Sequence, residues 1–191
     1  MAAVDFTIKW SNDLAKLIEE AGLKAPYAIA KALDEVGSKT ATLVIRATAA
    51  QAGVPYASAK NVISTRQAMG GGAGEYVITA RDVTLSLKQF GARPGTTGVS
   101  AAPWKRRLTF GHSFIGPGGH VFVRMVQGKG AKADGVRAGF LNVGRRSSRL
   151  PIHKLFGPSI PREMTKDRAE ETFYTVTQQL LPFTLEKWLL K

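Results

Sequence analysis

The stretch PYAIAKALDEVGSKTATLVIRATAAQA, residues 26–52, predicts one long amphipathic helix near the start of the chain. Its apolar residues recur at steps of three and four, which places them on one face of a helix. They are Ile29, Leu33, Val36, Leu43, Val44 and Ala47, with Thr40 on the same face. Pro26 suits a first helical turn and Gly53 suits a stop, so local signals set both ends of this helix.

The segments on either side of this helix carry weaker patterns. Residues 4–10 alternate like a strand, and Asn12 can cap a short helix over 12–20. After Gly53, Ser58 can cap another short helix. The glycine cluster at 70–74 then predicts a flexible connector.

The sequence between Glu75 and Arg124 changes its period. Short apolar runs separated by glycine and proline predict a small antiparallel sheet. The runs are Tyr76–Thr79, Val83–Phe90, Leu108–Phe110 and His120–Arg124. Gly116–Gly119 is typical of a hairpin turn. Residues 128–149 are rich in glycine and basic side chains and poor in large apolar ones, which predicts a long basic loop.

The last segment, 165–191, predicts a C-terminal helix. Thr165 is its candidate cap, and Pro182 should kink it. One apolar face is expected from Phe173, Val176, Leu180 and Phe183, with Trp188 as a further candidate. We therefore expect an α+β fold in a single domain, with a helical part over about 1–69, a β part over about 75–164 and the terminal helix after it.

The chain is strongly basic, with a formal net charge of +13 and a pI near 10.3. Fourteen Lys or Arg lie from Lys88 to Arg162, against one acid, Asp134. Such a charge favours a polyanion or an acidic protein surface as partner. Because most carboxylates lie near the two termini, opposite charges on identical subunits can also attract each other around a ring.

The composition narrows the functional classes. There is no cysteine, so disulfides, thiolate metal sites and cysteine nucleophiles are excluded. The first 20 residues do not resemble a secretory signal, and no apolar stretch is long enough for a membrane span, so we expect a protein made in a reducing cytosol and not exported.

An enzyme is not expected. The three histidines, His112, His120 and His153, lack metal-ligand spacing, so surface or interface positions are the favoured interpretation and no metal or cofactor is predicted. The glycines at 70–74 are not followed by the Lys-Ser or Lys-Thr of a phosphate loop. A cell-wall hydrolase would need a working acid pair, which the basic middle of the chain does not offer.

Two basic patches are candidates for contact with nucleic acid, because their charges neutralise phosphates. They are 104–107, which reads Trp-Lys-Arg-Arg, and 145–149, which reads Arg-Arg-Ser-Ser-Arg. The candidate contacts with DNA or an acidic partner are Lys105, Arg106, Arg107, Lys129, Lys132, Arg145, Arg146 and Arg149. DNA, an acidic protein and a merely solvated surface all remain open for these residues.

Four ordered blocks of the sequence resemble the phage minor tail protein Z family. They are LSLKQFGAR at 85–93, GVSAAPWK at 98–105, GHVFVR at 119–124 and RLPIHKLFGPSIP at 149–161. The resemblance extends more loosely to the helix at 26–52 and to the terminal helix.

This resemblance implies a structural virion protein, made in the host cytoplasm, that completes the head-proximal end of a phage tail and is needed for head–tail joining. The family has no catalytic residues to carry over. Its implied form is a homo-oligomeric ring, with a hexamer favoured and a dodecamer as the alternative. Its implied neighbours are tail terminator, tail tube and head–tail connector proteins, with genomic DNA passing through the channel and no membrane.

The expected interface residues come from the first, second and fourth blocks. They are Gln89, Phe90, Arg93, Trp104, Leu150, Pro151, Ile152, Phe156, Pro158 and Ile160. Proline-stiffened apolar segments are cheap to order against another subunit, but the same prolines can simply route the chain into its terminal helix. A non-specific DNA-binding module remains the alternative function.

Overall fold

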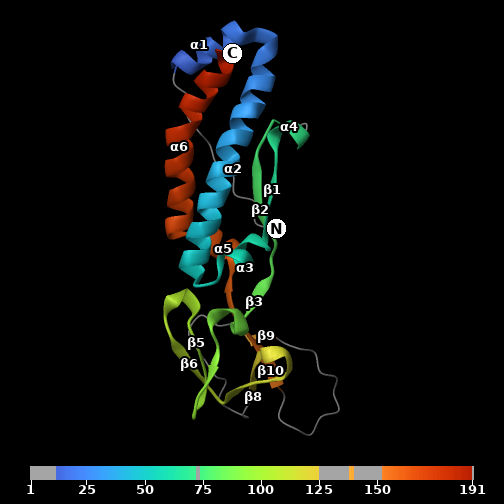
Figure 1. The fold of residues 1–191 in the computed structure, drawn as a ribbon, viewed down its shortest axis with the longest axis vertical. Coiled ribbons are helices and arrows are strands. Elements are labelled where there is room, and N and C mark those ends of the chain that lie inside the picture. Colours follow the sequence, from blue (N-terminus) through green and yellow to red (C-terminus); the bar gives the residue numbers. More distant parts are fainter. Residues whose placement is uncertain (1–11, 72–73, 125–137, 140–151, 191) are drawn as a thin grey trace.

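The computed structural model describes residues 12–71, 74–124, 138–139 and 152–190. The molecule is elongated, with its long helices at one end and most of its strands at the other (Figure 1). The helices are α1 (Asn12–Ala21), α2 (Ala25–Ala52), α3 (Tyr56–Lys60), α4 (Ala68–Gly71), α5 (Ile160–Met164) and α6 (Asp167–Leu189), with short 3-10 turns η1 (Gly22–Lys24), η2 (Leu87–Phe90), η3 (Pro103–Lys105) and η4 (Pro117–Gly119). The strands are β1 (Ile63–Arg66), β2 (Val77–Ala80), β3 (Thr84–Ser86), β4 (Arg93–Pro94), β5 (Gly98–Ala101), β6 (Leu108–Gly111), β7 (Ser113–Ile115), β8 (Val121–Arg124), β9 (Ala138–Gly139) and β10 (Ile152–Ser159). The expected α+β class is confirmed.

Helices α2 and α6 pack side by side along the upper part of the molecule (Figure 1). The predicted helix over 26–52 is confirmed, and it ends where Gly53 adopts a left-handed conformation with φ of 79°. Alanines on the inner face of α2 let α6 approach closely, and the shared core holds Ala32, Val36, Leu181 and Leu185. The two helices therefore form one apolar seam of their own.

One carboxylate ties the polar side of this seam. Glu35 of α2 accepts hydrogen bonds from Lys39 of its own helix and from Lys187 and Trp188 of α6, at 3.0–3.1 Å for the shortest contact of each donor. These bonds, the one from Lys39 above all, lower the pKa of the Glu35 carboxyl from 4.5 to about 2. The charged form of Glu35 therefore favours the folded state.

We expect this bond set to make stability depend on pH at the acid end. Because the pKa of Glu35 is lowered on folding, its contribution is fully present above the unfolded pKa of about 4.5 and is lost as the pH falls through about 2. The Glu35→Gln variant should be less stable than the wild type at pH 6, and the difference should shrink as the pH falls. Urea titrations across this range measure it, and a constant difference would contradict this role for Glu35.

Helix α6 differs from its prediction in two respects. It begins at Asp167 after Lys166, so Thr165 is not its cap; the Thr165 hydroxyl donates instead to the carbonyl of Arg162. Pro182 lies inside the helix, and the kink expected there stays a prediction. Its buried face includes Thr177, Leu181, Thr184 and Leu185, whereas Phe183 is 71% exposed, so the expected apolar face was wrong at Phe183. The Thr184 hydroxyl can be buried because it donates to the carbonyl of Leu180.

A hairpin of β1 and β2 lies against α2 and carries the short helix α4 at its tip (Figure 1). The Asp34 carboxylate of α2 accepts the backbone N–H of Ala68 at 2.6 Å and that of Met69 at 3.4 Å. Because this contact caps α4, the glycines at 70 and 71 are helical, where a connector was predicted. Ser58 also differs from its predicted role, since it lies inside α3 after Pro55.

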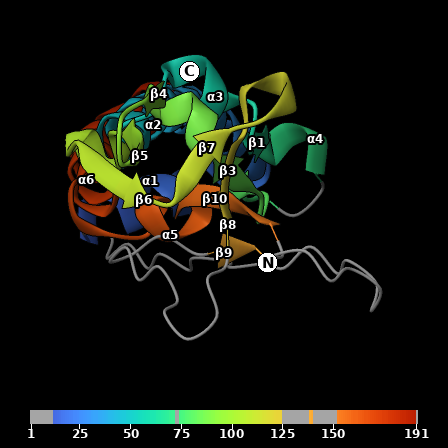
Figure 2. The ribbon, with the colours of Figure 1, turned by 90° about the horizontal axis from the view of Figure 1, so that it is seen from below.

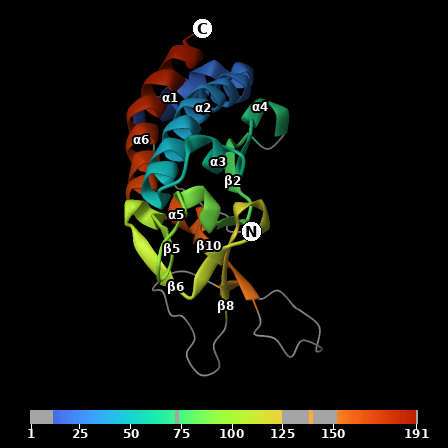
Figure 3. The ribbon, with the colours of Figure 1, turned by 60° about the horizontal axis from the view of Figure 1, so that its bottom comes forward.

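The strand end is built around β10. This strand pairs antiparallel with β3, β8 and β9, and β8 pairs in turn with β7. Strands β4, β5 and β6 form a separate sheet. The predicted hairpin turn at 116–119 is confirmed between β7 and β8. Figure 2 looks along the long axis onto β5, β6, β7 and β8, and Figure 3 shows the same strands below α2 and α6.

The larger core joins the strand end to the second half of α2. It contains, among others, Val44, Ile45, Leu87, Phe90, Val99, Phe110, Val121, Leu155 and Ile160. Within the expected basic loop, Ala138–Gly139 forms β9, and the remainder of that loop lies outside the described residues, as does the strand expected over 4–10. One core therefore spans residues from both the helical and the β parts of the chain.

Candidate polyanion-binding surface

The strand end carries positive charge almost without compensation. From Val83 to Arg124 the sequence has no Asp or Glu. Its six basic side chains, Lys88, Arg93, Lys105, Arg106, Arg107 and Arg124, are all exposed, and β10 adds the half-buried Lys154. We call these seven residues the basic end. A surface of this kind attracts phosphates or carboxylates from a partner.

The turn η3 and the two residues that follow it carry three of these charges. Trp104 and Lys105 adopt left-handed backbone conformations, with φ of 52° and 57°, which non-glycine residues rarely do. The turn packs directly on the end of α2, where a Cβ on Gly53 would lie 2.7 Å from the Lys105 nitrogen. Such backbone conformations persist only where the surrounding structure holds them in place. The turn thereby positions Lys105, Arg106 and Arg107 at the surface, where all three are exposed.

Buried Glu163 holds the turn from below. Its side chain is 9% exposed, and its Oε1 accepts the indole N–H of Trp104 at 3.1 Å. Its Oε2 accepts the Gln51 amide at 3.0 Å. The Glu163 carboxylate of α5 thus links the end of α2 to η3 through two hydrogen bonds and holds η3 in place.

The structure divides the expected interface residues into three groups. Gln89, Arg93 and Ile152 are exposed, and Trp104 and Phe156 are half-buried. Phe90, Pro158 and Ile160 are buried in this chain, because β10 and η2 pack into its own core; they offer no surface to a neighbour. The expected contacts that lie outside the described residues are Leu150, Pro151, Lys129, Lys132, Arg145, Arg146 and Arg149.

The segment 152–161 also corrects the expectation of an extended arm. Its residues form β10 and the start of α5, with Lys154 paired to Phe122 and Phe156 paired to Ser86. The backbone of this segment is paired with strands of the same chain. Its prolines therefore lie where the chain passes from β10 into α5. That is the alternative left open from the sequence.

The three histidines lie in different surroundings. His112 is exposed with φ of 56°, while His153 is buried in β10, which differs from the surface or interface position expected for it. His120 is half-buried, and its Nδ1 lies 2.9 Å from the hydroxyl of Ser86. Sequence reasoning missed this pair because 34 residues separate its members and only the pairing of β10 with both β3 and β8 brings them together.

No set of three His, Asp or Glu that could hold a metal ion occurs among the described residues.

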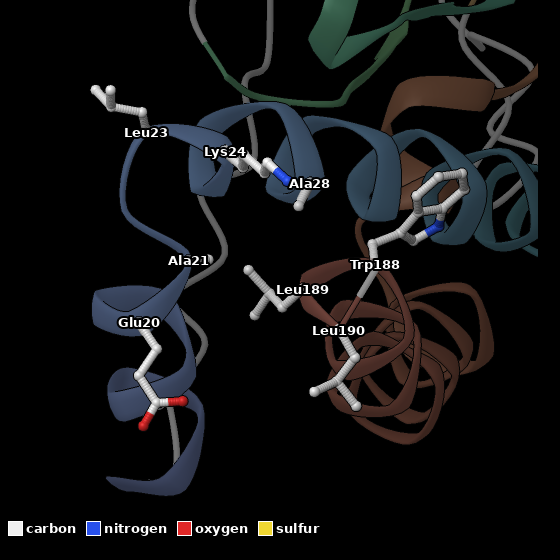
Figure 4. Close-up of a pocket in the computed structure, with 8 residues that line it drawn as sticks. All are labelled: Glu20, Ala21, Leu23, Lys24, Ala28, Trp188, Leu189 and Leu190. Atoms are coloured by element: carbon white, nitrogen blue, oxygen red, sulfur yellow. The ribbon is translucent and has the colours of Figure 1, made fainter.

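A shallow pocket lies at the opposite end of the molecule, between α1, η1 and the end of α6 (Figure 4). Its lining includes Leu23, Trp188, Leu189 and Leu190 beside the charged Glu20 and Lys24. Leu23 is fully exposed and Leu190 largely so. In the close-up the Glu20 carboxylate points away from the leucines, so the polar groups do not converge on one ligand position.

No protein-family model, curated protein or solved structure matches the chain. Across the described residues, none of the helices combines the length and the apolar character that crossing a membrane requires.

Proposed function

We propose that this protein is a structural virion protein of a tailed phage, a tail-completion or neck subunit that forms a ring at the head-proximal end of the tail and serves head–tail joining. The observation that supports this proposal best is that the four sequence blocks that resemble the minor tail protein Z family meet in one part of the fold. They contribute β3 and η2, then β5 and η3, then β8, and finally β10 with the start of α5.

The contacts between the blocks are direct. Phe156 pairs with Ser86, Lys154 pairs with Phe122, and the Ala102 N–H donates to the Phe90 carbonyl at 2.9 Å. Segments far apart in the sequence thus build one part of the strand end. This clustering favours a common structural role for the four blocks over a coincidence of short matches.

The two ends of the molecule suit contact between identical subunits. One end is basic, and the other exposes Leu23, Tyr27 and Leu190 among charges of both signs, Lys16, Glu19, Glu20 and Lys24. Unlike ends allow a head-to-tail contact, which closes into a ring when the rotation between subunits permits. A hexamer is the favoured ring and a dodecamer the alternative, with tail terminator, tail tube and connector proteins as neighbours and the virion as location. This function requires no catalytic group or cofactor.

The mass of the purified protein tests the proposal. Six copies of the 20.5 kDa chain give about 123 kDa, and twelve give about 246 kDa. We expect one of these species by light scattering, either from the protein alone or after mixing with tail-tube and connector proteins. A chain that stays monomeric in both conditions would overturn the proposal.

Charge reversal tests whether the subunits associate through the basic end. The triple variant Arg93→Glu, Arg106→Glu and Arg107→Glu should lower the ring fraction several-fold, because it removes the positive end. The matched control places the same change at exposed residues away from both ends, Arg46→Glu, Lys60→Glu and Arg168→Glu. Equal loss in both variants would show that net charge, and not the basic end, drives assembly.

Non-specific DNA binding is the second candidate function, favoured by the absence of acids from Val83 to Arg124. It predicts that the isolated monomer binds duplex DNA and that its affinity falls steeply with salt. Tight binding by a monomer that ignores tail proteins would favour this function over the ring.

A further inference from the structure

One part of the basic end gathers polar groups where β3, the β7–β8 turn and β10 meet. Ser86 holds His120 through the 2.9 Å contact at Nδ1, and the ammonium group of Lys88 donates to the Gly118 carbonyl at 2.7 Å. Lys154 lies on β10 between the strands of the other members, because Lys154 pairs with Phe122 of β8 and Phe156, two residues later, pairs with Ser86 of β3. Three separate segments thus bring two ammonium groups and an imidazole together.

The charges in this cluster are uncompensated. Burial, followed by the positive charges of Lys154 and Lys88, lowers the pKa of His120. The ion pairs of the described residues involve Lys39, Arg66 and Lys187, none of which belongs to the cluster. Two ammonium groups gathered without a carboxylate form a positive field that an anion would relieve.

The glycine turn makes room for this arrangement. Gly118 and Gly119 have φ of 73° and 75°, conformations that other residues rarely adopt. A Cβ on Gly119 would lie 3.2 Å from the Lys88 side chain, and one on Gly118 would lie 3.4 Å from the His120 ring. Both side chains therefore lie against the turn, and the turn fixes their positions relative to each other.

We propose that Lys88, Lys154 and His120 form a binding site for a phosphate group, with Ser86 as the residue that positions the imidazole. When the Ser86 hydroxyl donates to Nδ1, Nε2 of the neutral ring carries a proton and can donate to a phosphate oxygen. The two ammonium groups supply charge-assisted hydrogen bonds to the same anion. The phosphate can come from a nucleic-acid backbone or from a free phosphate ion. The site shares Lys88 and Lys154 with the basic end, but the binding test does not require the ring to form.

Titration of the full chain with two probes tests the site. Inorganic phosphate and a short DNA duplex are added separately while the ring resonances of His120 are followed by NMR. We expect the His120 resonances to shift with at least one probe. A shift with phosphate alone identifies a free anion as sufficient, whereas a shift with the duplex only identifies the nucleic-acid backbone as the source. No His120 shift with either probe would overturn the proposal.

Variants separate the site from general basicity. Lys88→Gln with Lys154→Gln should weaken the binding reported by His120 at least about tenfold, because two charge-assisted contacts are lost. The control variant, Lys16→Gln with Lys60→Gln, makes the same change of net charge at exposed residues on α1 and α3 and should leave it within about twofold. Equal weakening in both variants would overturn the site. Ser86→Ala should weaken binding less than the lysine pair while shifting the His120 resonances of the free protein.

Discussion

Replacing Phe90 with alanine is expected to lower the free energy of unfolding by about 3–5 kcal/mol, the usual effect of deleting a buried aromatic ring. Phe90 is 2% exposed at the end of η2 and belongs to the core that joins α2 to the strand end. Its ring lies over Gly157 of β10, where a Cβ would come within 2.2–2.9 Å of three ring atoms. Denaturant titration measures the change, and Leu23→Ala, at a fully exposed leucine, should change stability by less than about 0.5 kcal/mol.

The contact between Phe90 and Gly157 can be tested from its other side. Gly157→Ala should cost about 1–3 kcal/mol, because the added methyl group must displace the ring. In the Phe90→Ala background the ring is gone and the methyl group has room, so the double variant should cost clearly less than the two single losses added together. Strict additivity would show that the ring does not lie over Gly157.

Helices α1, α2 and α6 could be predicted because their signals are local. The apolar spacing over 26–52, Pro26 and Gly53 lie within the segment that they define, and α2 follows them within one residue at its start. The same holds for α1 and for the turn between β7 and β8. The start of α6 was placed two residues early because Thr165 is a good capping residue by type, yet its hydroxyl bonds back to Arg162.

The central strand could not be predicted, because its partners are distant in sequence. β10 pairs with β3, which ends at Ser86, and with β8, which ends at Arg124. Taken alone, the segment 150–161 shows prolines and apolar residues that suit an extended arm equally well. Only the pairing of Phe156 with Ser86 and of Lys154 with Phe122 decides between the two interpretations.

The charged residues of the candidate site could be predicted from the sequence, whereas the contacts that hold them in place could not. Lys105, Arg106 and Arg107 could be chosen from composition, and they are exposed at the basic end. The support beneath them could not, because Gln51 and Glu163 are 112 residues apart and Glu163 reads as one of several terminal carboxylates. The sequence shows which side chains are charged, whereas the fold decides which carboxylate becomes buried under them.

Glu163→Ala is therefore expected to have the second large effect, lowering the free energy of unfolding by about 2–4 kcal/mol. Glu163 is 9% exposed, and its loss leaves the partly buried Trp104 indole N–H without its acceptor. It also removes the 3.0 Å bond of the Gln51 amide, which keeps only its 3.3 Å contact to the backbone carbonyl of residue 163. Hydrogen bonds to charged groups are worth about 1.5–3 kcal/mol each, and an unsatisfied buried donor costs a comparable amount. Calorimetry or denaturant titration measures the loss.

The same variant should also release η3, because the left-handed conformations of Trp104 and Lys105 are held by the contact below them. The indole N–H resonance of Trp104 should move toward its solvent-exposed position, and ligand or subunit contacts made by Lys105, Arg106 and Arg107 should weaken although none of these residues is changed.

The Glu163→Gln variant keeps one acceptor oxygen, so its stability and its Trp104 resonance should lie between those of the alanine variant and the wild type. Glu171→Ala removes the same charge at an exposed position and should leave both stability and the Trp104 resonance unchanged. If Glu163→Ala lowers stability but leaves the indole resonance in place, Glu163 supports the core alone, and the presentation of the basic turn must depend on the packing of Gly53 against Lys105.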